Sequence, residues 1–232
     1  MTEEIDADRH FDYITMVMKE NETFLDENAG EIYDEVLDLI LDSIEYVSRA
    51  VKRERSREEY VKHPTVFFLH HILMPSSYAI QTDLLTGNLP VCFMQLRLML
   101  ESLAKCYLAD LKYPDQSFFQ EKLELLEIET KMKNGKVVSK REHDFIEEFD
   151  RVLGSNRKSL KLWGKLSQDW IHTKGVVNRI VDRITEKSDV PSWAFIISKY
   201  RENDLDTIEE LGKGISQFRS LLKDAIGKCP QE

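Results

Sequence analysis

The chain is poor in the residues that break helices and form tight turns. Its 232 residues include only nine glycines and six prolines. Proteins built from many short strands need more of both, because these residues supply the turn conformations. Segments that alternate apolar and polar residues, as half-buried strands do, are also scarce. The sequence therefore predicts an all-α protein.

Cysteine is scarce as well. The three cysteines, Cys92, Cys106 and Cys229, form no CxxC pair and no zinc signature. Cys92 and Cys106 fall within one predicted helix, about 21 Å apart at ~1.5 Å per residue, which is too far for a disulfide. An odd, sparse set of this kind indicates reduced thiols, and we expect a cytoplasmic protein.

Long apolar runs and leader-like segments are missing too. The most apolar stretch, residues 84–111, is interrupted by Arg97, Glu101, Lys105 and Asp110, so no membrane span is expected. The first 13 residues are acidic and polar, unlike a signal or transit peptide.

The common catalytic and cofactor motifs do not occur. The chain has no P-loop, no GxGxxG after a strand, no HExxH and no GxSxG. It also lacks the Glu-x-x-His pairs that build metal sites in helical bundles. We therefore expect no cofactor and no metal, and the sequence leaves open whether the chain is an enzyme.

Charge, in contrast, is abundant. Charged residues make up 32% of the chain and apolar residues 42%, which is typical of a globular protein. The net charge of −10 argues against binding nucleic acid over the whole surface, although a local basic face stays open. Asn and Gln total only 14, a balance often found in thermophile proteins.

Apolar periodicity predicts a bundle of about seven to nine helices in a single domain, residues 1–232. The predicted helices span residues 3–20, 31–60, 65–85 with a bend or interruption near Pro75, 89–112, 158–187 with Gly175 as a candidate break, and 205–226. The helix at 89–112 is apolar nearly all round, which is typical of a central helix. The helix at 31–60 is acidic first and basic last, which matches the helix dipole and indicates a structural role.

A charged insertion interrupts this pattern at residues 115–155. It predicts a helical hairpin with its tip at Asn134-Gly135 and only a thin apolar stripe. We expect this hairpin to protrude from the bundle or to pack against a partner.

Two opposite charges lie inside the apolar face of the predicted central helix. Arg97 and Glu101 are four residues apart. They share a helical face with Phe93, Leu100, Ala104 and Leu108. Burial of such a pair costs several kcal/mol per ion unless other groups satisfy it. The pair is therefore either an internal salt bridge that fixes how helices meet or part of a binding pocket.

Histidines provide the other candidates for chemistry. Trp163, Leu166 and Trp170 form a packing stripe, and His172 points the opposite way among cations that include Lys165. His172 could contact phosphate or act as an acid–base group, or it could lie on a solvated polar face. Adjacent His70 and His71 point ~100° apart on a helix, so they do not suit one metal, but one of them could meet Arg97 or Glu101.

The order of these features resembles the HEPN superfamily of small helical-bundle proteins. The resemblance rests on Arg97-x-x-x-Glu101, preceded by the turn at Gly87 and followed by Leu166, Ser167 and His172. It implies a homodimer and, in active members, RNA cleavage without metal by an Arg placed four to six residues before a His. Here residues 166–168 are Leu, Ser and Gln, and the nearest cation is Lys165.

Three functions follow from these observations. The first is an HEPN-like bundle that acts through self-association and an unidentified partner. The second is a metal-independent HEPN-like endoribonuclease or toxin that uses His172, with Lys165, Arg97 and Glu101 as accessory polar groups. The third is a nucleotide- or small-molecule-binding bundle with a pocket around Arg97 and Glu101, to which His70 and His71 could contribute.

Overall fold

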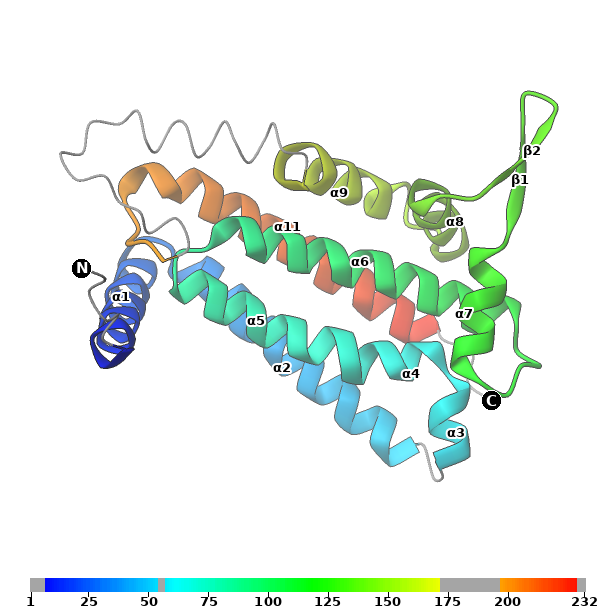
Figure 1. The fold of residues 1–232 in the computed structure, drawn as a ribbon, viewed down its shortest axis with the longest axis horizontal. Coiled ribbons are helices and arrows are strands. Elements are labelled where there is room, and N and C mark those ends of the chain that lie inside the picture. The colour runs from blue at the N-terminus through cyan, green and yellow to red at the C-terminus, as the bar shows by residue number, and fades with distance from the viewer. Residues whose placement is uncertain (1–6, 54–56, 172–196, 229–232) are drawn as a thin grey trace, which may run out of the picture.

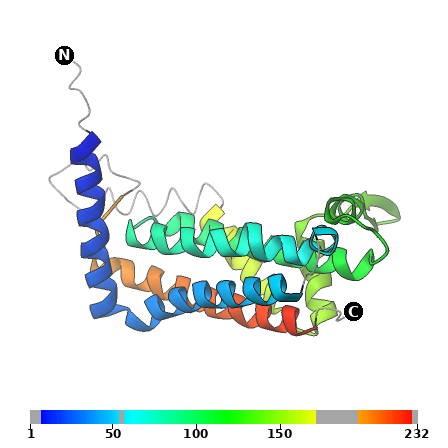
Figure 2. The same cartoon turned by 90° about the horizontal axis from the view of Figure 1, so that it is seen from below.

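The computed structural model describes residues 7–53, 57–171 and 197–228, and this part of the chain is almost entirely helical (Figures 1 and 2). The helices are α1 (Ala7–Asn28), α2 (Gly30–Arg53), α3 (Arg57–Lys62), α4 (Pro64–Phe68), η1 (Leu69–Leu73), α5 (Met74–Leu85), α6 (Leu89–Lys112), α7 (Phe119–Glu127), α8 (Glu142–Leu153), α9 (Lys158–Leu166), η2 (Ser167–Ile171), η3 (Glu202–Asp204) and α11 (Leu205–Lys228). The strands β1 (Thr130–Lys133) and β2 (Lys136–Ser139) form a two-stranded sheet. The predicted all-α bundle is confirmed.

Helix α6 lies at the centre of the bundle and has the bounds expected from the sequence (Figure 1). It contacts α4 and α5, α11, and the group α7, α8 and α9. Residues on nearly every side of α6 are buried, because these neighbours surround it. Buried apolar side chains from α1 to α11 join in one cluster around it. None of the described helices combines the length and apolar character that a membrane crossing requires.

The first two helices differ from the predicted bounds. Helix α1 does not end at residue 20 but continues to Asn28. The helix predicted over 31–60 is described as α2 from Gly30 to Arg53, and residue 60 belongs to α3. Val17, Asn21 and Leu25 recur every four residues and are all buried, so the inner face of α1 continues past residue 20. Asn21 is polar, but its amide group donates to the carbonyls of Leu85 and Ser198 at 2.8 and 2.9 Å.

The helix expected to be bent or interrupted near Pro75 is interrupted there by a π-turn. In η1 the amide of Met74 donates to the carbonyl of Leu69, five residues back, instead of four. Pro75 has no amide hydrogen, and its ring collides with the preceding turn of a regular α-helix. A wider turn directly before the proline relieves this collision.

The charged insertion is not a helical hairpin throughout, which corrects the prediction. Its flanks, α7 and α8, are helical, but its tip is the β-hairpin of β1 and β2, which extends beyond the bundle (Figure 1). The turn lies at Asn134 and Gly135, as predicted, with φ of 50° and 73°. Two successive residues with positive φ form the turn that joins antiparallel strands, so Asn-Gly favours a β-hairpin here.

The C-terminal third follows the prediction where the structure describes it. Helix α11 begins at residue 205 as expected and ends at Lys228. Of the helix expected at 158–187, α9 and the π-turn η2 are described. Gly175 and His172 lie outside the described residues.

Candidate functional site

Arg97 and Glu101 form an ion pair on α6, at the level of α9. The Nε atom of Arg97 lies 2.7 Å from Oε1 of Glu101. The two side chains keep only 17% and 21% of their surface exposed, so both are largely but not completely removed from water. The pair is therefore half-buried, as its place on an apolar face predicts.

Trp163 on α9 completes this group, which we call the Arg97 clamp (Arg97, Glu101 and Trp163). The indole Nε1 of Trp163 donates to the same Oε1 of Glu101 at 2.6 Å. The guanidinium of Arg97 stands over the Trp163 ring, 5.2 Å from its centroid. A cation over an indole ring is attracted to it, which explains the position of Arg97. An indole N–H can only donate a hydrogen bond, and the Glu101 carboxylate accepts it. The clamp joins α6 to α9.

Sequence reasoning assigned Trp163 only to a packing stripe and missed its bond to Glu101. The stripe itself is confirmed in its described part, since Leu166 and Trp170 are buried and Trp170 stacks on Phe93 with ring centroids 3.7 Å apart. A signal was available, because a half-buried tryptophan needs an acceptor for its N–H. The periodicity does not say which helix supplies that acceptor.

Lys165 lies on a different side of α9 from the clamp. Its Nζ atom is 3.3 Å from Oε1 of Glu210 on α11, and its side chain is half exposed. Trp170 donates to the same Glu210 oxygen at 3.4 Å. Lys165 therefore takes part in a link between α9 and α11. Its predicted partner in catalysis, His172, lies outside the described residues.

His70 and His71 contact α3 and α4, whereas the clamp contacts α9. Nε2 of His71 lies 2.7 Å from the hydroxyl of Tyr60, and the ring of His70 meets Tyr60 edge-on at 5.2 Å. Burial and the neighbouring His71 lower the pKa of His70. His70 is thus held in its neutral form near pH 7. The contacts of these histidines give them no part in the Arg97 clamp.

Asp110 and Lys122 form a buried ion pair that sequence reasoning did not predict. Nζ of Lys122 lies 3.0 Å from Oδ1 of Asp110, and the two side chains are only 1% and 5% exposed. Asp110 also accepts the amide of Thr65 at 2.9 Å and lies 3.3 Å from Nδ1 of His63. Burial raises the pKa of Asp110, but hydrogen bonds from His63 and Thr65 outweigh burial, and the pKa is lowered.

A second network, the hairpin-base network, consists of Lys112, Tyr113, Glu129, Lys140 and Glu148. Each lysine contacts both glutamates at 2.6 to 2.9 Å, and the Tyr113 hydroxyl donates to Glu129 at 2.7 Å. Burial raises the pKa of Glu129, but hydrogen bonds from Lys112, Lys140 and Tyr113 have the larger, opposite effect and lower the pKa to about 2. Burial and Glu129 raise the pKa of Tyr113 to about 12. The alternating charges fix the foot of the β-hairpin to α6 and α8.

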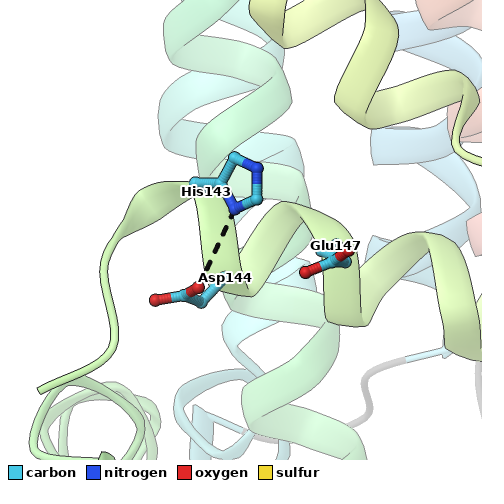
Figure 3. A group of neighbouring side chains, drawn as sticks. All are labelled: His143, Asp144 and Glu147. Atoms are coloured by element: carbon cyan, nitrogen blue, oxygen red, sulfur yellow. Dashed lines mark ion pairs between the residues drawn. The ribbon is translucent and has the colours of Figure 1, made fainter. Parts of the chain in front are cut away.

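Three side chains of α8 come close enough to share a cation: His143, Asp144 and Glu147 (Figure 3). One ligand atom from each lies within 4.8 Å of the others. Asp144, however, also bonds Lys131 of the hairpin and accepts the amide of Arg141 at 2.9 Å. Its carboxylate therefore serves the start of α8 and the hairpin, and exposed acidic groups of this kind are common without a metal.

Comparison of the chain with protein-family models, with curated proteins and with solved structures finds no match. No relative therefore assigns a role to any of these residues.

Proposed function

We propose that this chain is an HEPN-like helical-bundle protein that acts through self-association and an unidentified partner, without chemistry of its own. One observation carries the proposal. Among the described candidates, Arg97, Glu101, Lys165 and His71 bond to partners within the chain, while large apolar side chains stay exposed on the outside. Leu41 is 62% and Met132 67% exposed, for example. Exposed apolar surface of this kind is typical of an interaction site.

The Arg97 clamp supports a structural role for the charged pair. One oxygen of Glu101 already accepts two hydrogen bonds, and Arg97 lies against an aromatic ring. A ligand that entered between these groups would have to replace contacts that join α6 to α9. The clamp is thus better explained as a helix-to-helix link than as a nucleotide pocket.

The described nucleophiles support the same conclusion. Burial raises the pKa of the Cys92 and Cys106 thiols, so neither forms the reactive thiolate near neutral pH. Lys165 pairs with Glu210 and, as a lysine, lacks the planar fork of an arginine.

RNA is the second candidate partner, and the β-hairpin favours it. Residues 130–141 contain four lysines and one arginine but no acidic residue, in a chain whose net charge is −10. A protruding basic element can contact phosphates through Lys133 and Lys136 beside its turn, whereas Lys131 and Lys140 pair with acids of the chain. The second candidate function is therefore a metal-independent endoribonuclease with His172 as its acid–base group.

Two measurements on the full chain test the proposal. Light scattering at micromolar concentration is expected to give about twice the chain mass of 27.2 kDa. Incubation with single-stranded RNA in EDTA is expected to leave the RNA intact, with His172→Ala as the matched control. A mass near 27.2 kDa would overturn the self-association. Cleavage that disappears in His172→Ala would instead establish the endoribonuclease.

A further inference from the structure

A stripe of residues along α2 faces mostly away from the bundle, although Leu37 near one end packs partly against the core. Its members, which we call the α2 stripe, are Leu37, Leu41, Ile44, Ser48 and Val51. They recur at alternating steps of four and three residues, so they share one helical face, as the seam residues of a coiled coil do. Leu41 is 62%, Ile44 37% and Val51 55% exposed. Most of the stripe is therefore in contact with solvent.

Other sides of α2 are occupied within the chain. Arg219 of α11 bonds Glu35 and Asp42, each at 2.7 Å. On the side of α5, the hydroxyl of Ser43 meets that of Ser77 at 3.2 Å. These contacts hold α2 against α5 and α11 at the edge of the bundle (Figures 1 and 2). The stripe is thus carried on a firmly held helix.

Helix α2 is also electrically polar along its length. Residues 31–45 contain six acidic and no basic side chains, whereas residues 46–53 contain three basic and no acidic ones. Two copies of α2 side by side in the same direction would bring acid against acid. In opposite directions, each acidic half lies beside the basic half of the other copy. The charge pattern therefore favours the antiparallel direction when the partner is a second copy of this chain.

We propose that the α2 stripe pairs with the α2 stripe of a second copy of this chain, antiparallel, about a two-fold axis near Ile44. Ile44 then meets its own counterpart, Leu41 faces Ser48, and Leu37 faces Val51. Large side chains thus face smaller ones along the seam, as close packing requires. This inference rests on the self-association proposed above and assigns that association a surface and a direction.

The charged rim of the stripe fits the same arrangement. With the axis at Ile44, Lys52 comes level with residue 36 of the second copy and close to Asp34. The acid on the other side, Asp38, already lies 3.0 Å from Arg219 of its own chain. On α5, Tyr78 is 43% exposed and directly follows Ser77, which touches α2.

Cysteine cross-linking tests the direction and the register. In full-length Cys229→Ser protein, Ile44→Cys is expected to form a covalent dimer under mild oxidation. Val51→Cys is expected to stay uncrosslinked, because two copies of residue 51 would lie about 21 Å apart along the axis at ~1.5 Å per residue. A parallel pair would cross-link both variants and would overturn the proposed direction.

Charged substitutions test the surface itself. Leu41→Lys combined with Ile44→Lys is expected to weaken self-association by at least about tenfold in a dilution series followed by light scattering, because like charges would meet in the seam. Leu98→Lys on α6 is the matched control, since Leu98 is 47% exposed but lies outside the stripe. Circular dichroism checks that both variants keep their helices, as substitutions at exposed positions should.

The outcomes separate this inference from the function on which it rests. A monomeric wild-type chain overturns both. A wild-type dimer that keeps its affinity in the Leu41→Lys, Ile44→Lys variant, or that gives no Ile44→Cys cross-link, overturns the α2 surface and leaves self-association standing. Lys52→Glu and Asp34→Lys should each weaken the dimer, and the double variant should regain affinity, because the exchanged charges meet across the two-fold axis.

Discussion

Buried Asp110 and Lys122 show what a single ion pair does in this bundle. Each charge is almost completely removed from water, and Lys122 depends on Asp110 for compensation. Asp110→Asn would leave the Lys122 ammonium buried without a counter-charge. We expect the free energy of unfolding to fall by about 3–5 kcal/mol, measured by chemical denaturation.

The matched variant is Asp110→Asn combined with Lys122→Met. Because it removes both charges and keeps the shape of the site, most of the lost stability should return. If the changes that the two substitutions cause in the free energy of unfolding simply added up, Asp110 and Lys122 would not stabilise each other.

The hairpin-base network predicts a specific dependence on pH. The ordinary pKa of Glu129 is 4.5, and in the folded chain it is about 2. A lowered pKa means that the ionised form stabilises the fold, so this contribution is complete above pH 4.5 and is lost as the pH falls toward 2. Glu129→Gln should therefore destabilise the chain at pH 7, by about 1.5–3 kcal/mol for hydrogen bonds to a charged group.

The measurement is the melting temperature of both proteins over a pH series at constant ionic strength. The difference in melting temperature between wild type and Glu129→Gln should narrow below pH 4.5, because Glu129 becomes protonated first in the unfolded chain and then in the folded one. A gap that stays constant with pH would show that the charge of Glu129 does not matter.

At the scale of elements, the turn between α5 and α6 depends on one glycine. Gly87 has φ of 78°, and a Cβ atom there would lie 2.1 Å from the carbonyl oxygen of Ser198. Ser198 in turn donates its amide to the carbonyl of Thr86 at 3.0 Å. Gly87→Ala should therefore cost at least about 2 kcal/mol of stability, from backbone strain and overlap together.

Gly164 provides the control for this prediction. It lies inside α9, and a Cβ atom there would meet nothing within 4 Å. Gly164→Ala should raise the melting temperature slightly, because alanine favours a helix over glycine by about 0.5–1 kcal/mol. Equal effects of Gly87→Ala and Gly164→Ala on stability would contradict the contact between the α5–α6 turn and Ser198.

Prediction of the elements from the sequence succeeded where one strong local signal dominates. The bounds of α6 follow from an apolar run framed by Gly87 and Pro114, and the interruption of the helix before Pro75 follows from the missing amide. It failed at the β-hairpin, because four-residue strands are too short to show an alternating pattern. There, Asn134-Gly135 was the better guide than the surrounding helical periodicity.

At the scale of the whole molecule, the distribution of charge and apolar surface connects structure to the proposed association. The apolar core is continuous through the bundle, yet Leu41, Ile44 and Val51 of the α2 stripe stay outside it. A chain with a net charge of −10 resists self-association unless its charges are arranged to complement one another. The polarity of α2 provides such an arrangement when two copies meet antiparallel.

The sequence by itself determined that this chain is helical, that α6 is its central helix and that Arg97 and Glu101 lie on an apolar face. These features depend on residues close together in the chain, whose spacing is visible in the sequence. Only the tertiary structure decided that Trp163 closes the Arg97 clamp, that Lys122 neutralises Asp110 and that α5 and α11 leave the α2 stripe open. Each of these depends on which distant segments meet, and helical periodicity shows that a face is apolar without showing what covers it.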